Sequence, residues 1–326
     1  MSQNHVVIAP RATSTHTPCA RELDRALASG DFSRVEHLGP ADATDAVVTL
    51  LAIYDLWLGS LPSVDGRERY QNHPVVASLK WRLEADFVNR LEELVPPETV
   101  ETFDAVSALR RIARRDDAPI YDWLATSATW SQLVKFLAIE GGPDGGFDDL
   151  VAICQVGLDG APKVVLGANY WDEMGRGELA DVHTELHRQL VRAVDLPRLD
   201  WSELPSSALE RSALNGLLAT NRWLQPEMIG ALGLLELQAG PRCRRVLRAL
   251  RRLEAPSAAL PFYDEHADTD PRHGKEWLDG AVAPLVEAHP EWHARIVRGA
   301  RWRAELNSRL FADALKALQD VHAESA

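Results

Sequence analysis

Apolar residues recur along most of this chain with the period of an α-helix. Between residues 79 and 95 they stand three or four positions apart, on one helical face: Leu83, Phe87, Val88, Leu91 and Leu94. No run with the alternation of a strand is longer than about four residues, and no strand–helix–strand rhythm occurs. The sequence therefore predicts an all-α protein built as a helical bundle.

Glycine and proline divide the chain into its expected helices. These cover residues 21–27, 42–58, 79–95, 100–113, 119–139, 147–158, 163–174, 179–194, 208–220, 227–253, 262–288 and 291–321. Residues 1–20 are polar and are expected to form a disordered tail. Residues 21–118 are expected to pack as extra N-terminal helices on a core formed by 119–326, so that the whole chain is one compact domain.

Composition restricts the partners of the protein. The chain has 326 residues, 46% of them hydrophobic and 25% charged, which is typical of a globular protein. A net charge of −13 disfavours nucleic acid as a partner. The basic run at 242–252 is more simply a solvated helix face. Three widely spaced cysteines and no CxxC predict a reduced, cytoplasmic protein. No apolar run reaches the roughly 18 residues of a membrane span, and no signal peptide is evident.

The segment from 262 to 278 carries two histidines and an aspartate in helical spacing. At about 100° per residue, His266, Asp270 and His273 fall within about 60° of one another on a helix. Such a stripe either binds a transition metal or is a solvated polar face. Pro271 removes a backbone donor within it, so we expect this helix to be kinked or only conditionally helical. If the metal is iron, residues 262–275 are then expected to be frayed or disordered without it and to order when a second iron binds.

Further potential ligands lie on other predicted helices. Glu236 follows eight uncharged residues, and a buried carboxylate there requires a partner or a metal unless it reaches water at the helix edge. Glu140 ends an apolar helix. His183 lies in an apolar surrounding, with His187 as an alternative, and Glu173 is either a ligand or a surface acid. These carboxylates and histidines are too many to be the ligands of one tetrahedral zinc ion, and they suit two iron or manganese ions.

In their order and local sequence these residues resemble the haem-oxygenase-like diiron oxidases. The resemblance covers roughly residues 119–320 and is carried by four segments: Phe136-Leu-Ala-Ile-Glu140, Asn169-Tyr-Trp-Asp-Glu173-Met-Gly followed by His183, Leu234-Leu-Glu236, and His266-x3-Asp270-x2-His273. It implies a haem-oxygenase-like bundle in which Glu140, His183, Glu236, His266, Asp270 and His273 bind iron. Glu173 matches an additional carboxylate of members that oxygenate amine nitrogens, although Glu178 lies close enough to compete for that role.

The resemblance also implies a function. The protein is expected to use two iron ions (Fe2+/Fe3+) and O2 to convert a small amine to a hydroxylamine or nitro compound in secondary metabolism. Electrons are expected from an external reductant or reductase, since no flavin or nicotinamide motif is present, and a homodimer is mildly favoured. The alternatives are a diiron oxidase that desaturates or cleaves an amino-acid or fatty-acid chain, and a metal-free helical binding protein. Tyr170, Trp223 and Tyr263 either line a substrate pocket or are ordinary core aromatics.

Overall fold

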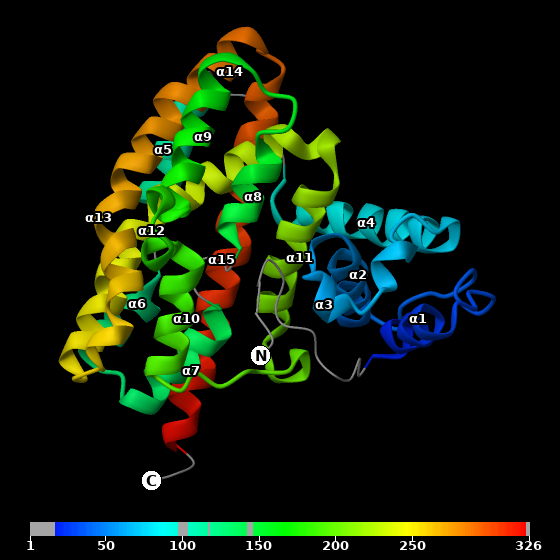
Figure 1. Cartoon of the computed structure of the whole chain (residues 1–326), viewed down its shortest axis with the longest axis horizontal. Coiled ribbons are helices and arrows are strands. Elements are labelled where there is room, and N and C mark those ends of the chain that lie inside the picture. The colour runs from blue at the N-terminus through cyan, green and yellow to red at the C-terminus, as the bar shows by residue number, and fades with distance from the viewer. Residues whose placement is uncertain (1–16, 97–103, 117, 142–145, 324–326) are drawn as a thin grey trace.

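A computed structural model describes residues 17–96, 104–116, 118–141 and 146–323. These residues form helices and connecting turns without a strand, which confirms the all-α class. The long helices form a bundle, and a smaller group of N-terminal helices lies at its side (Figure 1). None of the helices in the described ranges is long and apolar enough to cross a membrane.

The N-terminal group contains α1 (Pro18–Ser29), α2 (Ala43–Leu58), α3 (Leu61–Val64) and α4 (Pro74–Leu94). The first half of the bundle contains α5 (Ala105–Arg114), α6 (Pro119–Thr126), α7 (Trp130–Glu140), α8 (Phe147–Cys154), α9 (Gly160–Glu173) and α10 (His183–Ala193). The second half contains α11 (Ser206–Thr220), α12 (Gln225–Arg252), α13 (Pro261–Glu276), α14 (Ala283–Ala288) and α15 (Trp292–Ala323). A π-helical turn at Trp277–Val282 joins α13 to α14.

The centre of the bundle is α12, which packs against α5, α6, α13 and α15. Glycines allow its backbone to approach α15 closely. A Cβ atom on Gly230 would overlap the carbonyl group of Ile296, and one on Gly299 would overlap that of Glu227. Larger residues at these positions would force the two helices apart. The eight uncharged residues that precede Glu236 therefore lie in the core helix of the molecule.

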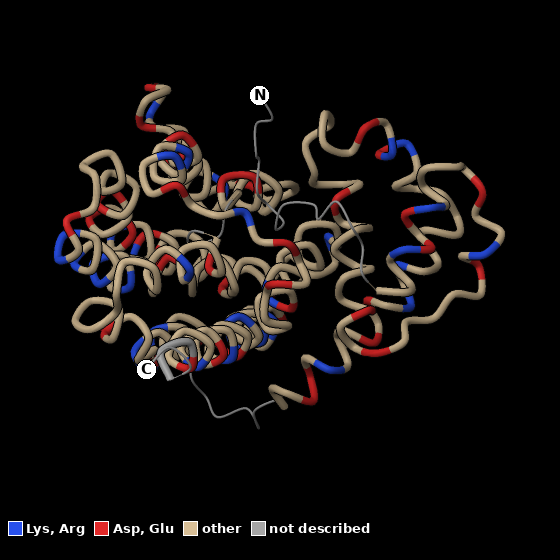
Figure 2. The backbone as a smooth tube through the Cα atoms, turned by 90° about the horizontal axis from the view of Figure 1, so that it is seen from below, with Lys and Arg blue, Asp and Glu red and all other residues tan. Residues whose placement is uncertain are grey.

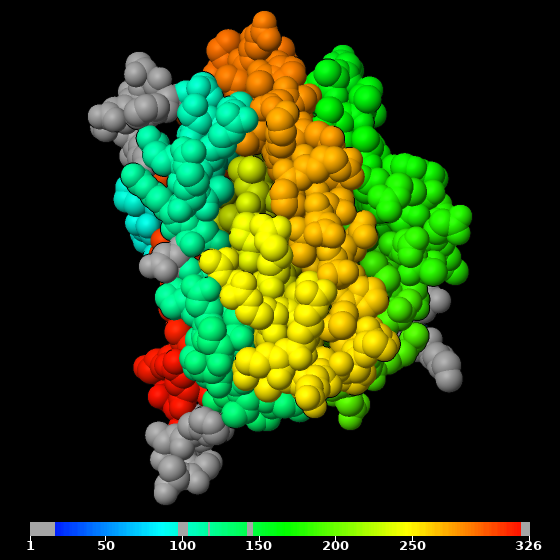
Figure 3. Space-filling view, turned by 90° about the vertical axis from the view of Figure 1, so that its left-hand side faces the viewer, coloured from blue at the N-terminus to red at the C-terminus, as the bar shows by residue number. Residues whose placement is uncertain are grey.

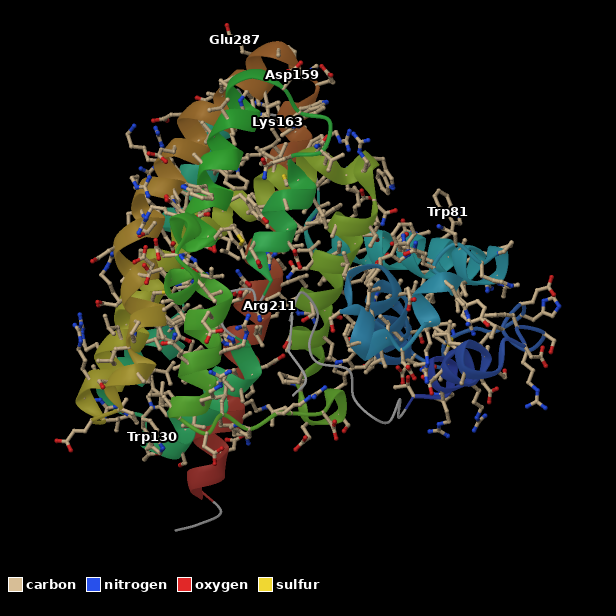
Figure 4. The ribbon with its side chains drawn as sticks, viewed as in Figure 1. Trp81, Trp130, Asp159, Lys163, Arg211 and Glu287 are labelled. Atoms are coloured by element: carbon tan, nitrogen blue, oxygen red, sulfur yellow. The ribbon has the colours of Figure 1, made fainter. Side chains whose placement is uncertain are left out.

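The N-terminal helices share a hydrophobic core with the bundle. One continuous cluster of buried side chains includes Leu50 of α2, Leu83 of α4, Leu214 of α11 and Leu232 of α12. We therefore propose that residues 21–118 and the bundle fold as one domain, as the sequence suggests. The outer side of this group remains open to solvent, where Trp81 projects from α4 with 70% of its surface exposed (Figure 4).

The expected disordered tail is wrong at its C-terminal end. Helix α1 begins at Pro18, and Cys19 and Ala20 are fully buried. The carboxylate of Asp45 in α2 accepts the backbone N–H of Cys19 at 3.1 Å, which satisfies a donor that has no partner within its own helix. Residues 1–16 lie outside the described ranges.

The expected helix at 119–139 is two helices, α6 and α7. The chain breaks at 127–129 because Thr129 caps the second helix: the backbone N–H of Gln132 donates to its hydroxyl, and the Gln132 side chain accepts the backbone N–H of Thr129. This reciprocal cap is visible in the sequence as Thr-x-x-Gln. Its effect is to set the direction of α7, whose last residue is Glu140.

Charged residues of both signs are interspersed along the chain (Figure 2). The basic run of α12 is exposed or half-buried except for Arg242, which is buried and pairs with Asp116 at 2.6 Å. The solvated-face interpretation is therefore wrong for this one arginine. The three cysteines are all buried with free thiols.

Candidate metal centre

Helices α9 and α10 bring a carboxylate and an imidazole together. Glu173 is the last residue of α9 and His183 is the first residue of α10. The connection can be tight because Gly175 has a φ of +60°, and a Cβ atom there would lie 2.6 Å from the carbonyl carbon of Asp181. As a result, Oε2 of Glu173 lies 2.6 Å from Nδ1 of His183.

Helices α12 and α13 supply the other side of the centre. Glu236 lies in the middle of α12, opposite His266, Asp270 and His273 of α13. The two helices approach closely at Gly274, where a Cβ atom would be 3.2 Å from the Glu236 carbonyl. In the space-filling view of Figure 3, α13 lies beside α12 on one side and α9 and α10 on the other.

The structure forms two groups of potential ligand atoms. Glu173, His183 and His266 form the first group, and Glu173, Glu236 and His273 form the second. Within each group the ligand atoms all lie within 4.8 Å of one another, and every member is buried. Glu173 belongs to both groups, so one carboxylate stands between two sets of donors.

The donor atoms are arranged for a cation rather than for one another. Among the described residues, no hydrogen-bond partner faces Nδ1 of His183, Nδ1 of His273 or Oδ2 of Asp270, and all three atoms are buried. The 2.6 Å contact between His183 and Glu173 lacks the alignment of a hydrogen bond. Buried polar atoms normally have partners, because leaving them without one is costly. Carboxylate oxygens and imidazole nitrogens together suit iron, so these residues fit the metal that the sequence suggests.

The outer atoms of the ligands are held by neighbouring groups. Nδ1 of His266 lies 2.6 Å from the carbonyl oxygen of Phe262, which accepts its proton and leaves Nε2 for a metal. Nδ2 of Asn169 donates to Oε1 of Glu236 at 2.7 Å. Nε2 of His273 lies 2.9 Å from Oδ2 of Asp172. Such contacts fix the orientation of ligands before a metal arrives.

The electrostatics of the centre reflect its burial and its surplus of carboxylates. Burial, together with the charges of Glu236 and Glu173, raises the pKa of Asp270 well above its usual value. Burial lowers the pKa of His266 to about 4, and the nearby His183 adds to this effect. For His273, burial is outweighed by contacts with Glu236 and Asp172, so its pKa rises to about 9. A proton on His273 therefore offsets part of the negative charge of the neighbouring carboxylates at neutral pH.

Glu140 is buried but lies in neither group. Its carboxylate accepts the hydroxyl of Tyr121 at 2.5 Å and that of Tyr263 at 3.5 Å. A cavity of about 20 Å³ beside it, also lined by Arg211 and Asn307, has room for roughly one water molecule. In Figure 4, Arg211 points from α11 toward this part of the bundle. Tyr263 thus contacts a predicted ligand.

The remaining predicted site residues differ in their positions. Glu178 is exposed, so the buried Glu173 is the better candidate for the additional carboxylate. His187 is half-buried and packs on Phe262 with ring centroids 5.1 Å apart, outside both groups. Tyr170 packs against the buried cluster that the N-terminal helices share with the bundle.

Trp223 is 53% exposed and precedes Glu236 by 13 residues, about 20 Å along a helix, so it lies away from the centre.

The chain stays helical through Pro271, since α13 continues from Pro261 to Glu276. The neighbouring helix α12 provides two compensations. Nη1 of Arg244 donates at 2.6 Å to the carbonyl of Ala267, the acceptor that loses its helical partner at a proline four residues later. Gly240 leaves room for the ring, because a Cβ atom there would lie 2.9 Å from Cδ of Pro271.

Sequence reasoning missed the residues that support the ligands. Asp172 and Asn169 both lie in the segment Asn169-Tyr-Trp-Asp-Glu173, one helical turn apart. Because Asp172 directly precedes the predicted ligand Glu173, the sequence could have identified it as a residue of the site. Arg244 gave no signal, because its role depends on which carbonyl of α13 it faces.

Comparisons with known proteins agree with this site. The chain is similar to a nitrosourea synthase from Streptomyces achromogenes subsp. streptozoticus, with 30% identity over 133 residues. The aligned part is 39% of this chain and 28% of that protein, so the chain spans less than a third of its relative. A family model described as "iron-containing redox enzyme" matches residues 136–308, which include every residue of both groups. Because this match covers more than half of the chain, the protein belongs to the family of iron-containing redox enzymes.

Proposed function

We propose that the protein is a non-haem diiron oxygenase that transfers oxygen to the nitrogen of a small amine. The observation that carries the proposal is the position of Glu173 in both ligand groups. A carboxylate has two oxygens and can serve two cations at once. One buried carboxylate between two donor sets favours a pair of metal ions over a single ion.

In this proposal Glu173, His183 and His266 hold one iron, and Glu173, Glu236 and His273 hold the other. Asp270 would add the oxygen atom that has no hydrogen-bond partner. Glu140 remains a proposed ligand: its Oε2 accepts the Tyr263 hydroxyl at 3.5 Å, and its Oε1 accepts the Tyr121 hydroxyl at 2.5 Å.

The chemistry that reduced iron supplies when bound is the activation of O2. The chain's own part is to bind, orient and exclude water. The ligands lie in a buried region, with exposed fractions between 1% and 8%, so reactive oxygen is shielded from solvent. For the first oxygenation, one oxygen atom enters an N–H bond to give a hydroxylamine. The other leaves as water, with two electrons and two protons from an external donor.

Two observations support a nitrogen substrate. The similar protein is named a nitrosourea synthase, a name that denotes a product with a nitroso group on nitrogen. The chain also has a buried carboxylate, Glu173, which by sequence resemblance matches the additional carboxylate of N-oxygenating members. We infer an amine substrate on these grounds, with O2 and an external reductant as co-substrates.

Matched variants of two nearby glutamates test the metal centre. Glu173→Gln removes a carboxylate from both groups, whereas Glu178→Gln changes an exposed acid five residues later. After reconstitution with Fe(II) without oxygen, the wild-type protein and Glu178→Gln should contain two irons per chain. Glu173→Gln should lose most of both, and Glu236→Gln should keep one. Equal iron in Glu173→Gln and wild type would refute the shared-ligand proposal.

Product analysis tests the reaction. The reconstituted protein is supplied with candidate amines, a chemical reductant and 18O2, and products are followed by mass spectrometry. Incorporation of 18O on nitrogen supports the proposal. Loss of two hydrogens or of CO2 without added oxygen would instead support the desaturating or chain-cleaving oxidase. A protein that binds no iron and consumes no O2 would be a helical binding protein.

A further inference from the structure

Asp172 contacts a proposed ligand from outside the metal groups. It precedes Glu173 on α9, but its side chain reaches His273 of α13. Oδ2 of Asp172 lies 2.9 Å from Nε2 of His273. Asp172 is 12% exposed and the imidazole 1% exposed, so the contact is shielded from solvent. One helix end therefore supplies both a shared carboxylate and a partner for an imidazole on the facing helix.

Two surface arginines hold Asp172 in place. Nη2 of Arg272 donates to Oδ2 at 2.5 Å, and Nη1 of Arg176 donates to Oδ1 at 3.3 Å. Both guanidinium groups are about half exposed. Nη2 of Arg272 also lies 3.4 Å from Nε2 of His273, but its contact with the carboxylate is much shorter. Each oxygen of Asp172 thus has a cationic donor, which keeps the side chain ionised and oriented.

This arrangement decides which nitrogen of His273 is available. With Nε2 turned to Asp172, Nδ1 faces the interior, where it lies 3.6 Å from Oε2 of Glu236 and has no hydrogen-bond partner. If the ring turned over, Nε2 would leave its acceptor and a buried N–H would lose its partner. His266 is held in the opposite sense, with Nδ1 turned to a backbone carbonyl. The two histidines of α13 therefore present different nitrogens.

Building on the proposed diiron function, we propose that Asp172 is a positioning residue that fixes His273 as an Nδ1 donor to the second metal. Arg272 and Arg176 act through Asp172 by holding its carboxylate against the ring. The carboxylate accepts the Nε2 proton, so that the imidazole bound to metal is oriented and more basic. Partners of this kind typically contribute about 10- to 100-fold to metal affinity.

Cobalt(II) titration tests this role, because its visible absorption reports both stoichiometry and ligand geometry. Wild-type protein should bind two Co(II) ions per chain. Asp172→Ala should keep the first and weaken the second by about 10- to 100-fold, with a changed spectrum for the second ion. Asp172→Asn should recover part of that loss, since an amide oxygen can accept the proton but carries no charge.

The control is Asp264→Ala, which removes an exposed aspartate on α13 that pairs with Arg251 at 3.1 Å. It should bind both ions like the wild type. Wild-type affinity and spectrum for the second ion in Asp172→Ala would overturn the proposal. If circular dichroism shows that Asp172→Ala is unfolded, the same result in Asp172→Asn overturns it. Fewer than two ions in the wild-type protein would refute the diiron function itself, which separates the two failures.

Discussion

The proline in helix α13 offers a sharp test of how the structure holds its candidate metal centre. Pro271 has no N–H for the carbonyl of Ala267, and Nη1 of Arg244 donates to that carbonyl at 2.6 Å. Arg244→Ala removes the substitute donor. Pro271→Ala restores a backbone N–H at position 271, which is the usual helical donor to the Ala267 carbonyl. If Arg244 replaces the missing amide, the first substitution should destabilise α13 only while the proline is present.

The magnitude follows from the kind of bond that is lost. A hydrogen bond from a charged donor contributes about 1.5–3 kcal/mol when buried. This contact is part-buried and the arginine is exposed, so solvent reduces the value to about 1–2 kcal/mol. Local opening of α13 should then increase about 5- to 30-fold. With Ala at position 271, the carbonyl has its helical partner again and the same substitution should change opening by less than about twofold.

Hydrogen exchange followed by mass spectrometry, on a peptide covering 262–276 in metal-free protein, measures both effects. Arg251→Ala is the control, because it breaks only an exposed pair between α12 and α13. An equal increase in exchange from Arg244→Ala in both backgrounds would refute the reasoning. Repeating the measurement with Fe(II) tests the prediction that this segment becomes ordered when iron binds: exchange equally slow in both states would contradict it.

Other perturbations have equally direct outcomes. Gly240→Ala should lower the free energy of unfolding by about 1–3 kcal/mol in a thermal or urea melt, since its Cβ would meet the ring of Pro271, whereas Gly39→Ala, with nothing within 4 Å, should be neutral. His187→Gln should leave two irons per chain, because His187 lies in neither ligand group; loss of one iron would make it a ligand. Metal affinity should rise between pH 6 and 8, because His273, with a pKa near 9, carries a proton that the metal must displace. Each displaced proton raises the metal affinity about tenfold per pH unit. Calorimetry in two buffers counts the protons released on binding. A metal affinity that does not change with pH would contradict this prediction.

The sequence predicted the class and most helices of the fold because apolar periodicity records burial directly. It was wrong where a local interaction overrides that periodicity. The hydroxyl of Thr129 ends one helix and starts another within a continuous apolar pattern. The start of α1 depends on Asp45, 26 residues away from Cys19. Such a contact has no signature in the composition of the segment that it stabilises.

The candidate site also contains features that the sequence could predict and others that it could not. Burial of Glu236 could be foreseen, because its neighbours on α12 are uncharged. That Glu173 stands in both ligand groups could not, since this depends on how the tight turn at Gly175 brings α9 against α10. Nor could the sequence place Trp223, which is near Glu236 in number but lies in the 3-10 turn before α12 with 53% of its surface exposed. Closeness in sequence is a poor guide to a pocket when a long helix intervenes.

The ligand helix α13 depends on its neighbours more than on its own sequence. Its proline removes an internal hydrogen bond, and its buried Asp270 lies near the carboxylates of Glu236 and Glu173. Arg244 and Gly240 of α12 compensate for the proline, and Asp172 of α9 holds the last ligand, His273. Substitution of these supporting residues, none of which is a proposed metal ligand, should therefore weaken metal binding before it unfolds the bundle. The affinity of the centre for metal therefore depends on the packing of α9 and α12 around α13.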